Sequence, residues 1–349
     1  MTLKVGLIGC GSITERHVEG WKRIRDRAQI VALADISEAN ARVRAAQIGE
    51  PVEIYANYRD LLAIKEIDAV DIALPHHLHR DSIVAAAKAR KHVLAEKPLC
   101  LNLQEAEDIA QAVKESGITM MAMHNQLFMP SILQAKQMIM KGDLGEIHLI
   151  NSFDCGTSRG PLNLDKSNWG QKQGWQWAGT WRSDPAKLGG GELIDTGYHP
   201  TYRLLFLAGQ KPAEVTAMLG TYRLPLQCED TARVLVKFEG GVMGSIMSSW
   251  AMTTPGAPRL RFQVVGEKGQ LWGELDKLYY QPIDFQSPAT VEYPGWEIKR
   301  TAHAAIQHFV DAVQGGFEPL HSVAEATETL RLILAAYRSV EESRIIKLQ

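Results

Sequence analysis

The stretch "VGLIGCGSITERHV", residues 5–18, decides the expected fold of the first part of the chain. A short apolar run leads into a turn that contains Gly9 and Gly11, and a segment of helical character follows at once. Two glycines allow a tight turn and a close approach of backbone to a diphosphate, at which the helix directs its unpaired N–H groups. The third glycine of the usual fingerprint is replaced by Thr14. The stretch predicts the phosphate-binding turn of a dinucleotide-binding domain.

An acidic residue follows the turn at the distance that this motif requires. Asp35 ends the second apolar run, roughly 20 residues beyond the glycines. A carboxylate there accepts hydrogen bonds from the ribose of NAD and repels the additional phosphate of NADP, and no Arg or Lys follows in "DISEAN". Without the glycine turn, Asp35 could equally well be an aspartate of an ordinary turn or a helix cap, with no role in cofactor binding. With the glycine turn it predicts NAD as cofactor, preferred over NADP.

Up to about residue 125 the chain alternates between short apolar runs and segments of helical period. The apolar runs span 3–9, 29–35, 69–75, 91–97 and 118–124, with helical segments between them, as at 79–89 and 103–115. Strands that are apolar throughout and alternate with helices are typical of a parallel sheet covered on both faces. The sequence therefore predicts an α/β fold whose first domain, residues 1–125, is a doubly wound Rossmann-type sheet.

From about residue 126 the pattern changes to successive half-exposed strands joined by glycine turns. This is typical of a mostly antiparallel sheet. We expect an α+β domain over 126–349, with a large open sheet whose one face is covered by helices near 191–207, 302–313 and 323–341. The other face needs cover, which predicts a homo-oligomer, a dimer or tetramer, formed through this sheet.

Composition excludes several classes of protein. The 349 residues are 45% hydrophobic and 22% charged, as in a globular protein of two domains. The net charge of −2 and the lack of a basic run argue against a nucleic-acid partner, and no apolar run is long enough to predict a membrane span. The N-terminus resembles no signal peptide, so the cytoplasm is the expected compartment. The four cysteines form no CxxC pair, and the cluster of His76, His77 and His79 has no nearby carboxylate, so we expect no metal.

Two further stretches carry groups for acid–base chemistry. "LAEKPL", residues 94–99, puts Lys97 at the carboxyl end of a parallel strand, where such sheets bind ligands. "GGGELIDTGYHP", residues 189–200, sets Asp195 and His199 four residues apart, so that one helix would direct both from the same face. The three glycines would let the backbone pass close to cofactor or substrate. Taken singly, these would be ordinary surface residues.

Together the segments resemble the glucose–fructose oxidoreductase/inositol dehydrogenase (Gfo/Idh/MocA) family. The resemblance rests on "GCGSITERHV", "LPHHLHRDSIVAAAKARKHVLAEKPL", "HNQLFMPS" and "GGGELIDTGYH", and it extends over essentially the whole chain. It implies an NAD(P)-dependent dehydrogenase acting on CH–OH groups. It also implies that the Lys of E-K-P and the Asp and His of D-x-x-x-H, here Lys97, Asp195 and His199, form the catalytic set. The chain departs from the family at His76, often asparagine in relatives, and in the segment 125–128, which lacks the arginine of N-x-R-F.

The expected reaction is oxidation of a secondary hydroxyl of a sugar, sugar acid or cyclic polyol. His199 would accept the hydroxyl proton and Lys97 would stabilise the developing alkoxide, with Lys97 as the base in a rival assignment. Asp195 would bond the substrate or hold the other two in position. A redox-neutral glycosidase, epimerase or dehydratase is the alternative function. A non-catalytic sugar or NAD sensor is a third, against which the presence of all three residues speaks.

The remaining site predictions follow from the same segments. The predicted cofactor contacts are Gly9, Gly11, Ser12, Ile13, Asp35, Leu74, Pro75, His76, His79, Glu96, Lys97, Asn125 and Arg182. The predicted substrate contacts are Lys97, His124, Trp169, Trp175, Trp177, Arg182, Asp195 and His199. Four of the eight tryptophans lie in 165–182, where indole faces would stack on sugar rings or, alternatively, anchor a loop or a subunit contact.

Overall fold

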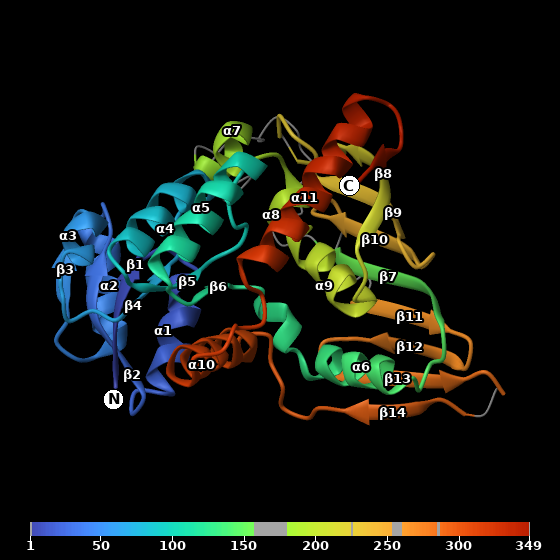
Figure 1. Ribbon diagram of the computed structural model, residues 1–349, viewed down its shortest axis with the longest axis horizontal. Coiled ribbons are helices and arrows are strands. Elements are labelled where there is room, and N and C mark those ends of the chain that lie inside the picture. Colours follow the sequence, from blue (N-terminus) through green and yellow to red (C-terminus); the bar gives the residue numbers. More distant parts are fainter. Residues whose placement is uncertain (1, 157–179, 225, 253–259, 285–286, 349) are drawn as a thin grey trace. The chain divides into compact units, whose positions relative to one another are not determined.

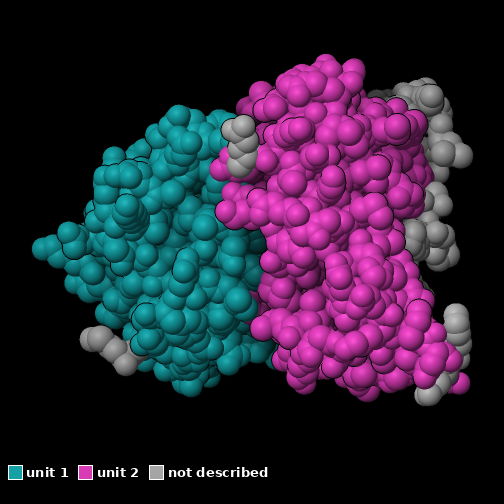
Figure 2. Space-filling model, turned by 45° about the vertical axis from the view of Figure 1, so that its right-hand side comes forward, with its two compact units in different colours: residues 1–125, 299–327 teal, residues 126–298, 328–349 magenta. Residues whose placement is uncertain are grey.

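The computed structural model describes residues 2–156, 180–224, 226–252, 260–284 and 287–348. Contacts divide the chain into two compact units, coloured teal and magenta in Figure 2. The first unit comprises 1–125 and 299–327, and the second comprises 126–298 and 328–349. The predicted domain boundaries, 1–125 and 126–349, remain a prediction. The two units differ from these domains because residues 299–327 belong to the first unit.

The first unit is built on a parallel sheet to which, among the described residues, six strands belong (Figure 1). In spatial order they are β3 (Glu53–Tyr55), β2 (Ala28–Ala34), β1 (Leu3–Ile8), β4 (Ala69–Ile72), β5 (His92–Ala95) and β6 (Met120–Ala122). Strand order reverses between β1 and β4, so their carboxyl ends form the switch point where open α/β sheets bind ligands. The predicted fold class is confirmed for this part of the chain.

Helices form two groups around this sheet. One group contains α3 (Tyr58–Leu62), α4 (His79–Lys88) and α5 (Leu103–Ser116); the other contains α1 (Thr14–Lys22), α2 (Glu38–Ile48) and α10 (Arg300–Gly315). Helix α5 begins where the side chain of Asn102 caps the N–H of Glu105 and ends at Gly117, whose φ is +68°. Such caps satisfy end groups that the helix itself leaves unpaired, so the local sequence fixes where the helix starts and stops.

The helix expected near 302–313 does not cover the second sheet, contrary to the prediction, but packs in the first unit. The ring of Phe309 on α10 meets that of Trp21 on α1 edge-on, with centroids 6.4 Å apart. An added Cβ at Gly20 would lie 2.6 Å from Ile306, so that glycine allows the two helices to approach closely. The apolar spacing predicted an amphipathic helix correctly, but spacing alone carries no information about which sheet its buried face meets.

The second unit contains a mixed, mostly antiparallel sheet, as predicted. In the part of the chain that the structure describes it has nine strands: β14 (Ala289–Glu292), β13 (Lys277–Pro282), β12 (Gly269–Gly273), β11 (Phe262–Gly266), β7 (Ile147–Cys155), β10 (Met243–Ser249), β9 (Thr231–Phe238), β8 (Pro212–Gly220) and β15 (Ile346–Lys347). Strands β7 and β10 pair in parallel, and their neighbours pair antiparallel. Alternate residues of β9 are buried and exposed, so one face of the sheet packs on helices.

The helices of the second unit pack mainly on the central strands. They include α6 (Pro130–Lys141), α8 (Glu192–Asp195) and α9 (Tyr198–Ala208), which contact strands of this sheet (Figure 1). The remaining elements are α7 (Pro185–Leu188), α11 (Val323–Glu341) and the short 3₁₀ helices η1 (His76–Leu78), η2 (Asn125–Phe128) and η4 (Trp181–Ser183).

The single helix expected over 191–207 is divided into α8 and α9. The N–H of Gly197 donates to the carbonyl of Glu192, 2.8 Å away, rather than to the carbonyl four residues back. An added Cβ at Gly197 would lie 2.6 Å from the Cα of Leu193, so a glycine is needed at this bend. Asp195 and His199 therefore belong to two helices, and the prediction that they share one helical face was wrong.

Candidate active site

The turn between β1 and α1 has the shape of an anion site. Gly9 has a φ of +95°, and a Cβ there would lie 2.4 Å from the carbonyl oxygen of Ala73. Apart from Gly11 and its two chain neighbours, no described heavy atom lies within 4 Å of the position that a Cβ of Gly11 would take. Helix α1 follows with no side chain capping its first turn. The open space and the uncapped N–H groups suit the diphosphate of a dinucleotide, and the predicted contacts Ser12 and Ile13 lie in the same turn.

Asp35 stands beside this turn, just after β2. One carboxylate oxygen accepts a hydrogen bond from the N–H of Cys10 and the other from the N–H of Ser37, both at 2.7 Å. Each carboxylate oxygen can accept a further bond, so the group suits ribose hydroxyls as well. The thiol of Cys10 is buried, and burial together with the charge of Asp35 raises its pKa to about 12. Cys10 is therefore a neutral thiol that fills the turn.

His79 ties together two backbone segments near Lys97. Its ring is fully buried, with Nδ1 2.7 Å from the carbonyl oxygen of Pro98 and Nε2 2.9 Å from that of Leu74. Burial lowers the pKa of His79 below its usual value. Both ring nitrogens thus contact backbone oxygens of the chain itself, which holds Leu74 and Pro98 in place. The predicted contacts Pro75 and His76 continue from Leu74 into η1, and His76 is buried.

A buried charge network lies behind Lys97 and was not predicted. Nδ1 of His17 is 2.9 Å from a carboxylate oxygen of Asp71, and Nε2 is 3.0 Å from one of Glu96. Burial alone would lower the pKa of His17, but the charges and hydrogen bonds of the two carboxylates outweigh it and raise the pKa to about 10. His17 is therefore an imidazolium at neutral pH that donates both N–H groups. The indole N–H of Trp21 also donates to Asp71, at 2.7 Å.

Glu96 connects this network to Lys97. Burial would raise the pKa of Glu96, but the hydrogen bond and charge of His17 bring it below its usual value. Its second oxygen accepts the backbone N–H of Lys97 at 3.1 Å. Glu96 was predicted to contact the cofactor, and here its two oxygens bind His17 and the backbone. No sequence spacing could have revealed this, because residues 17, 71 and 96 come from separate elements.

His124 and Asn125 follow β6 in the first unit. The ring of His124 lies 5.2 Å, centroid to centroid, from that of His321. Burial lowers the pKa of both, His124 far below its usual value and His321 to about 3, so both rings are neutral at neutral pH. The side-chain amide of Asn125 donates to the hydroxyl of Thr301 at 2.8 Å. A neutral histidine can donate to or accept from a sugar hydroxyl, which suits the predicted role of His124.

In the second unit Asp195 and Arg182 form an ion pair. Nε of Arg182 is 3.2 Å from a carboxylate oxygen of Asp195, which is only 1% exposed. The guanidinium also lies over the ring of Trp181, 4.2 Å from its centroid. The structure thus joins two predicted site residues directly. Trp169, Trp175 and Trp177 lie outside the described residues.

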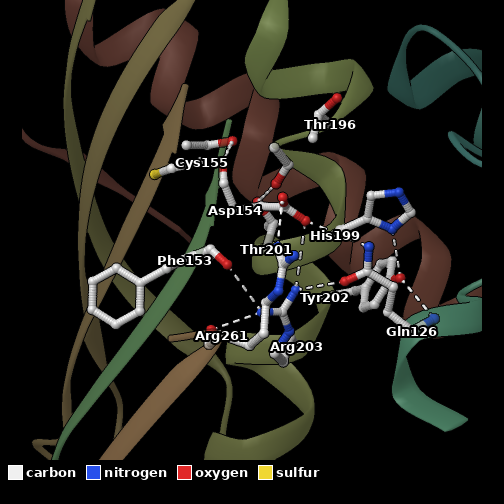
Figure 3. Close-up of polar contacts among 12 residues, drawn as sticks. Gln126, Phe153, Asp154, Cys155, Thr196, His199, Thr201, Tyr202, Arg203 and Arg261 are labelled. Atoms are coloured by element: carbon white, nitrogen blue, oxygen red, sulfur yellow. Dashed lines mark hydrogen bonds and ion pairs between the residues drawn. The ribbon is translucent and has the colours of Figure 1, made fainter. Parts of the chain in front are cut away.

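His199 is the second residue of α9, after Tyr198, and its Nδ1 is 2.6 Å from the hydroxyl of Tyr202 (Figure 3). Neither Tyr202 nor the network behind it was predicted. The proposed catalytic groups divide between the units, with Lys97 in the first and Asp195 and His199 in the second.

Gly190 and Gly191, before α8, lie against protein groups of the second unit. An added Cβ at Gly190 would lie 2.4 Å from the hydroxyl of Tyr337 on α11, and one at Gly191 would lie 2.3 Å from the carbonyl oxygen of Glu229. The Tyr337 hydroxyl donates to the carboxylate of Glu229 at 2.7 Å and accepts the N–H of Gly191 at 3.2 Å. Gly190 and Gly191 are thus required by packing around the Tyr337–Glu229 pair.

Among the described residues, no group of three or more His, Cys, Asp or Glu side chains could hold a metal ion. None of the helices that these residues form has the length and apolar character needed to cross a membrane.

Two family models match this chain and decide its family. Residues 3–124 match the oxidoreductase family with an NAD-binding Rossmann fold, and residues 132–272 match the Gfo/Idh/MocA C-terminal domain. The chain belongs to the Gfo/Idh/MocA family. The predicted resemblance and the predicted class, oxidoreductase, are confirmed, and the first unit of this Gfo/Idh/MocA protein carries an NAD-binding Rossmann fold.

Relatives in this family match over the full length. The myo-inositol 2-dehydrogenase of Thermotoga maritima is 25% identical, covering 99% of both chains. The D-apiose dehydrogenase of Paraburkholderia graminis is 27% identical, covering 99% of this chain and 90% of the relative. Among solved structures, an NAD-binding oxidoreductase from Klebsiella pneumoniae is 26% identical, with a TM-score of 0.87 and complete coverage of both chains.

Proposed function

We propose that this Gfo/Idh/MocA protein is an NAD-dependent dehydrogenase that oxidises a secondary hydroxyl of a sugar, sugar acid or cyclic polyol. The observation that carries the proposal is the full-length match to a myo-inositol 2-dehydrogenase, together with an intact E-K-P and D-x-x-x-H set. The match to the D-apiose dehydrogenase covers 99% of this chain, as does the match to the scyllo-inositol 2-dehydrogenase (NAD⁺) of Bacillus subtilis. The fit of the β1–α1 turn to a diphosphate supports the cofactor.

The proposed chemistry uses Lys97, Asp195 and His199. The hydroxyl proton passes to His199, because the ordinary pKa of an imidazole lies close to neutral pH. The Lys97 ammonium donates a hydrogen bond to the same oxygen as negative charge develops there. Bound NAD⁺ would accept the hydride that leaves the carbinol carbon. Asp195 keeps the charged groups in position, and a neutral Lys97 acting as the base is the rival assignment.

A substrate panel tests the function directly. The purified chain is mixed with NAD⁺ or NADP⁺ and with inositols, aldoses, sugar acids and anhydrosugars, and the absorbance of reduced cofactor is followed. We expect net reduction of NAD⁺ with at least one secondary alcohol and an equal amount of ketone. The dehydrogenase proposal fails if calorimetry shows that NAD⁺ binds but no compound in the panel reduces it, with either wild type or Lys97→Ala. That result would favour the sensor function.

A redox-neutral reaction is the second candidate, and one relative favours it. The 2,7-anhydro-N-acetylneuraminate hydratase of Escherichia coli is 30% identical over 45% of this chain and 40% of its own length. In that class the cofactor is restored in every turnover. The panel separates the two classes, because product without net reduced cofactor would assign the redox-neutral reaction.

The preference for NAD is proposed to come from the negative charge of Asp35. Asp35→Asn removes the charge but keeps an oxygen for a backbone N–H. We expect the ratio of kcat/KM for NAD⁺ over NADP⁺ to fall about tenfold, because a charge-assisted bond to ribose becomes a neutral one and the repulsion of phosphate is lost. The exposed Asp60→Asn is the control. An unchanged ratio would show that another residue selects the cofactor.

We further propose a homo-oligomer, dimer or tetramer, formed through the second sheet. Met218, Leu235 and Met243 lie on neighbouring strands, and their side chains are exposed on one face of that sheet by the strand register. A neighbouring copy would cover them. Light scattering is expected to give at least twice the mass of one chain, and Leu235→Glu should reduce that mass. A wild-type monomer would refute the proposal.

A further inference from the structure

His199 is held by the residue one helical turn further along α9. Nδ1 of His199 and the hydroxyl oxygen of Tyr202 are 2.6 Å apart, and the two rings stand nearly perpendicular, at 87°. We propose that Tyr202 is a positioning residue that holds the His199 ring through Nδ1 and so makes Nε2 the nitrogen that takes the substrate proton. The inference rests on the proposed function, since it names the residue that prepares His199 for that role.

Tyr202 is itself held by a mostly buried set of polar groups. Its side chain is 2% exposed, and its hydroxyl oxygen accepts the backbone N–H of Gln126 at 3.2 Å (Figure 3). The amide oxygen of Gln126 accepts from the buried guanidinium of Arg203 at 2.8 Å, and its amide nitrogen lies 3.4 Å from the carboxylate of Asp154. The phenol oxygen therefore has a set position before any substrate binds.

Counting protons identifies which nitrogen of His199 can act as the base. A phenol oxygen has one hydrogen to donate and two positions at which to accept, and Gln126 uses one of these positions. If Tyr202 donated its hydrogen to Nδ1, the neutral ring would carry its proton on Nε2 and could not accept another there. If Nδ1–H donates to Tyr202, the lone pair is on Nε2. The proposed role of His199 as the base requires the second arrangement, in which Tyr202 accepts from Nδ1–H as well as from the N–H of Gln126.

The second arrangement also survives the proton transfer. When Nε2 takes a proton, the imidazolium keeps its Nδ1–H donated to Tyr202, and no group has to turn. In the first arrangement the only ring lone pair is on Nδ1, so the incoming proton and the phenol hydrogen would compete for that nitrogen. A neutral phenol also stabilises imidazolium less than a carboxylate would, so the proton is readily returned when the reaction runs toward reduction.

The kinetic test compares Tyr202→Phe with Thr201→Val. Thr201 is the neighbouring buried residue of α9, and its hydroxyl donates to the carbonyl of Gly197 at 2.7 Å, so the control removes one buried hydroxyl without contact to His199. With the panel alcohol that wild type oxidises fastest, we expect Tyr202→Phe to lower kcat about 30-fold with little change in KM. The acidic limb of the pH profile should move to lower pH, which the loss of a merely structural bond would not cause. Equal behaviour of the two variants would overturn the inference.

A spectroscopic test needs no substrate, and its deciding measurement is made on the wild-type protein. Nitrogen-15 NMR of histidine-labelled wild-type protein reports which ring nitrogen carries the proton, and His199→Gln assigns the signals. We expect neutral His199 to be protonated on Nδ1 and Tyr202→Phe to show a mixture of both forms. Wild-type protonation on Nε2 would overturn the inference. A fully active His199→Gln would instead overturn the proposed role of His199, whatever the form of the ring.

Discussion

Replacing His17 with leucine is expected to lower the free energy of unfolding at pH 7 by about 3–5 kcal/mol, because a buried carboxylate loses its partner. Asp71 is fully buried, and Glu96 is 13% exposed in its side chain, so neither can turn to water for compensation. The measurement is the unfolding free energy in urea. A loss below about 1 kcal/mol would mean that His17 is not charged in the folded protein.

The same variant should change the pH dependence of stability. The pKa of His17 is about 10 in the folded protein and about 6.5 for an unfolded chain, so the folded form holds its proton more tightly. The contribution of His17 to the free energy of unfolding is therefore complete below about pH 6.5 and is lost as pH rises toward 10. Wild type should lose stability over that window, and His17→Leu should lose much less.

Two conservative variants separate the two halves of the network. Each retains a side-chain amide near the position of one ring nitrogen: His17→Asn near Nδ1, which faces Asp71, and His17→Gln near Nε2, which faces Glu96. We expect each to lose less stability than His17→Leu. Arg25→Gln, which breaks an exposed ion pair with Glu50, is the control and should cost well under about 1 kcal/mol.

Arg203→Met is expected to destabilise the second unit by about 4 kcal/mol, because several buried acceptors lose their donor at once. The guanidinium of Arg203 is wholly buried and donates to the carbonyls of Phe153 at 3.1 Å and Arg261 at 2.7 Å, besides Gln126 (Figure 3). Burial lowers its pKa to about 10, so it is still protonated at neutral pH. The carboxylate of Asp154 keeps Arg261 at 2.8 Å, so the loss comes from unsatisfied oxygens rather than from an isolated charge.

Lysine should not replace this arginine. Arg203→Lys keeps the charge, but one ammonium cannot reproduce a planar fork that serves three acceptors in different directions, so we expect a loss of about 2 kcal/mol or more. Arg338→Met, which breaks an exposed ion pair with Glu342, is the matched control in the second unit and should change stability by less than about 1 kcal/mol. Thermal and urea unfolding of the three variants provide the comparison. Equal stability of Arg203→Lys and wild type would show that charge alone matters.

Local signals in the sequence were sufficient for the parts of the fold that local physics determines. The glycine turn at 9–11 and the apolar strands up to residue 125 predicted the parallel sheet, because each rests on neighbouring residues and strand period. The broken helix was missed because the bend brings Gly197 close to the backbone of Leu193, a proximity that only the folded turn creates. The place of α10 was missed because it depends on a ring contact between Trp21 and Phe309.

The candidate site shows the same division. Lys97, Asp195 and His199 stand in short motifs and were found as motifs, and their roles stay predictions. Tyr202 was missed although it lies only three residues after His199, one helical turn further along α9. His17 was not found because it reaches Asp71 and Glu96 across large separations in sequence. Side chains that act through partners distant in sequence cannot be predicted from the spacing of residues. They become visible only when distances between atoms are known.

The contact of Tyr337 with the glycine run has a consequence for handling this protein. The last helix supplies the phenol that fills the volume beside Gly190 and anchors Glu229, so the C-terminal region is part of the scaffold that shapes the Asp195 segment. Shortening the chain before that tyrosine would leave a hole under the very loop that an engineer would wish to preserve. Fusions and purification tags are therefore better placed so that α11 and β15 stay intact.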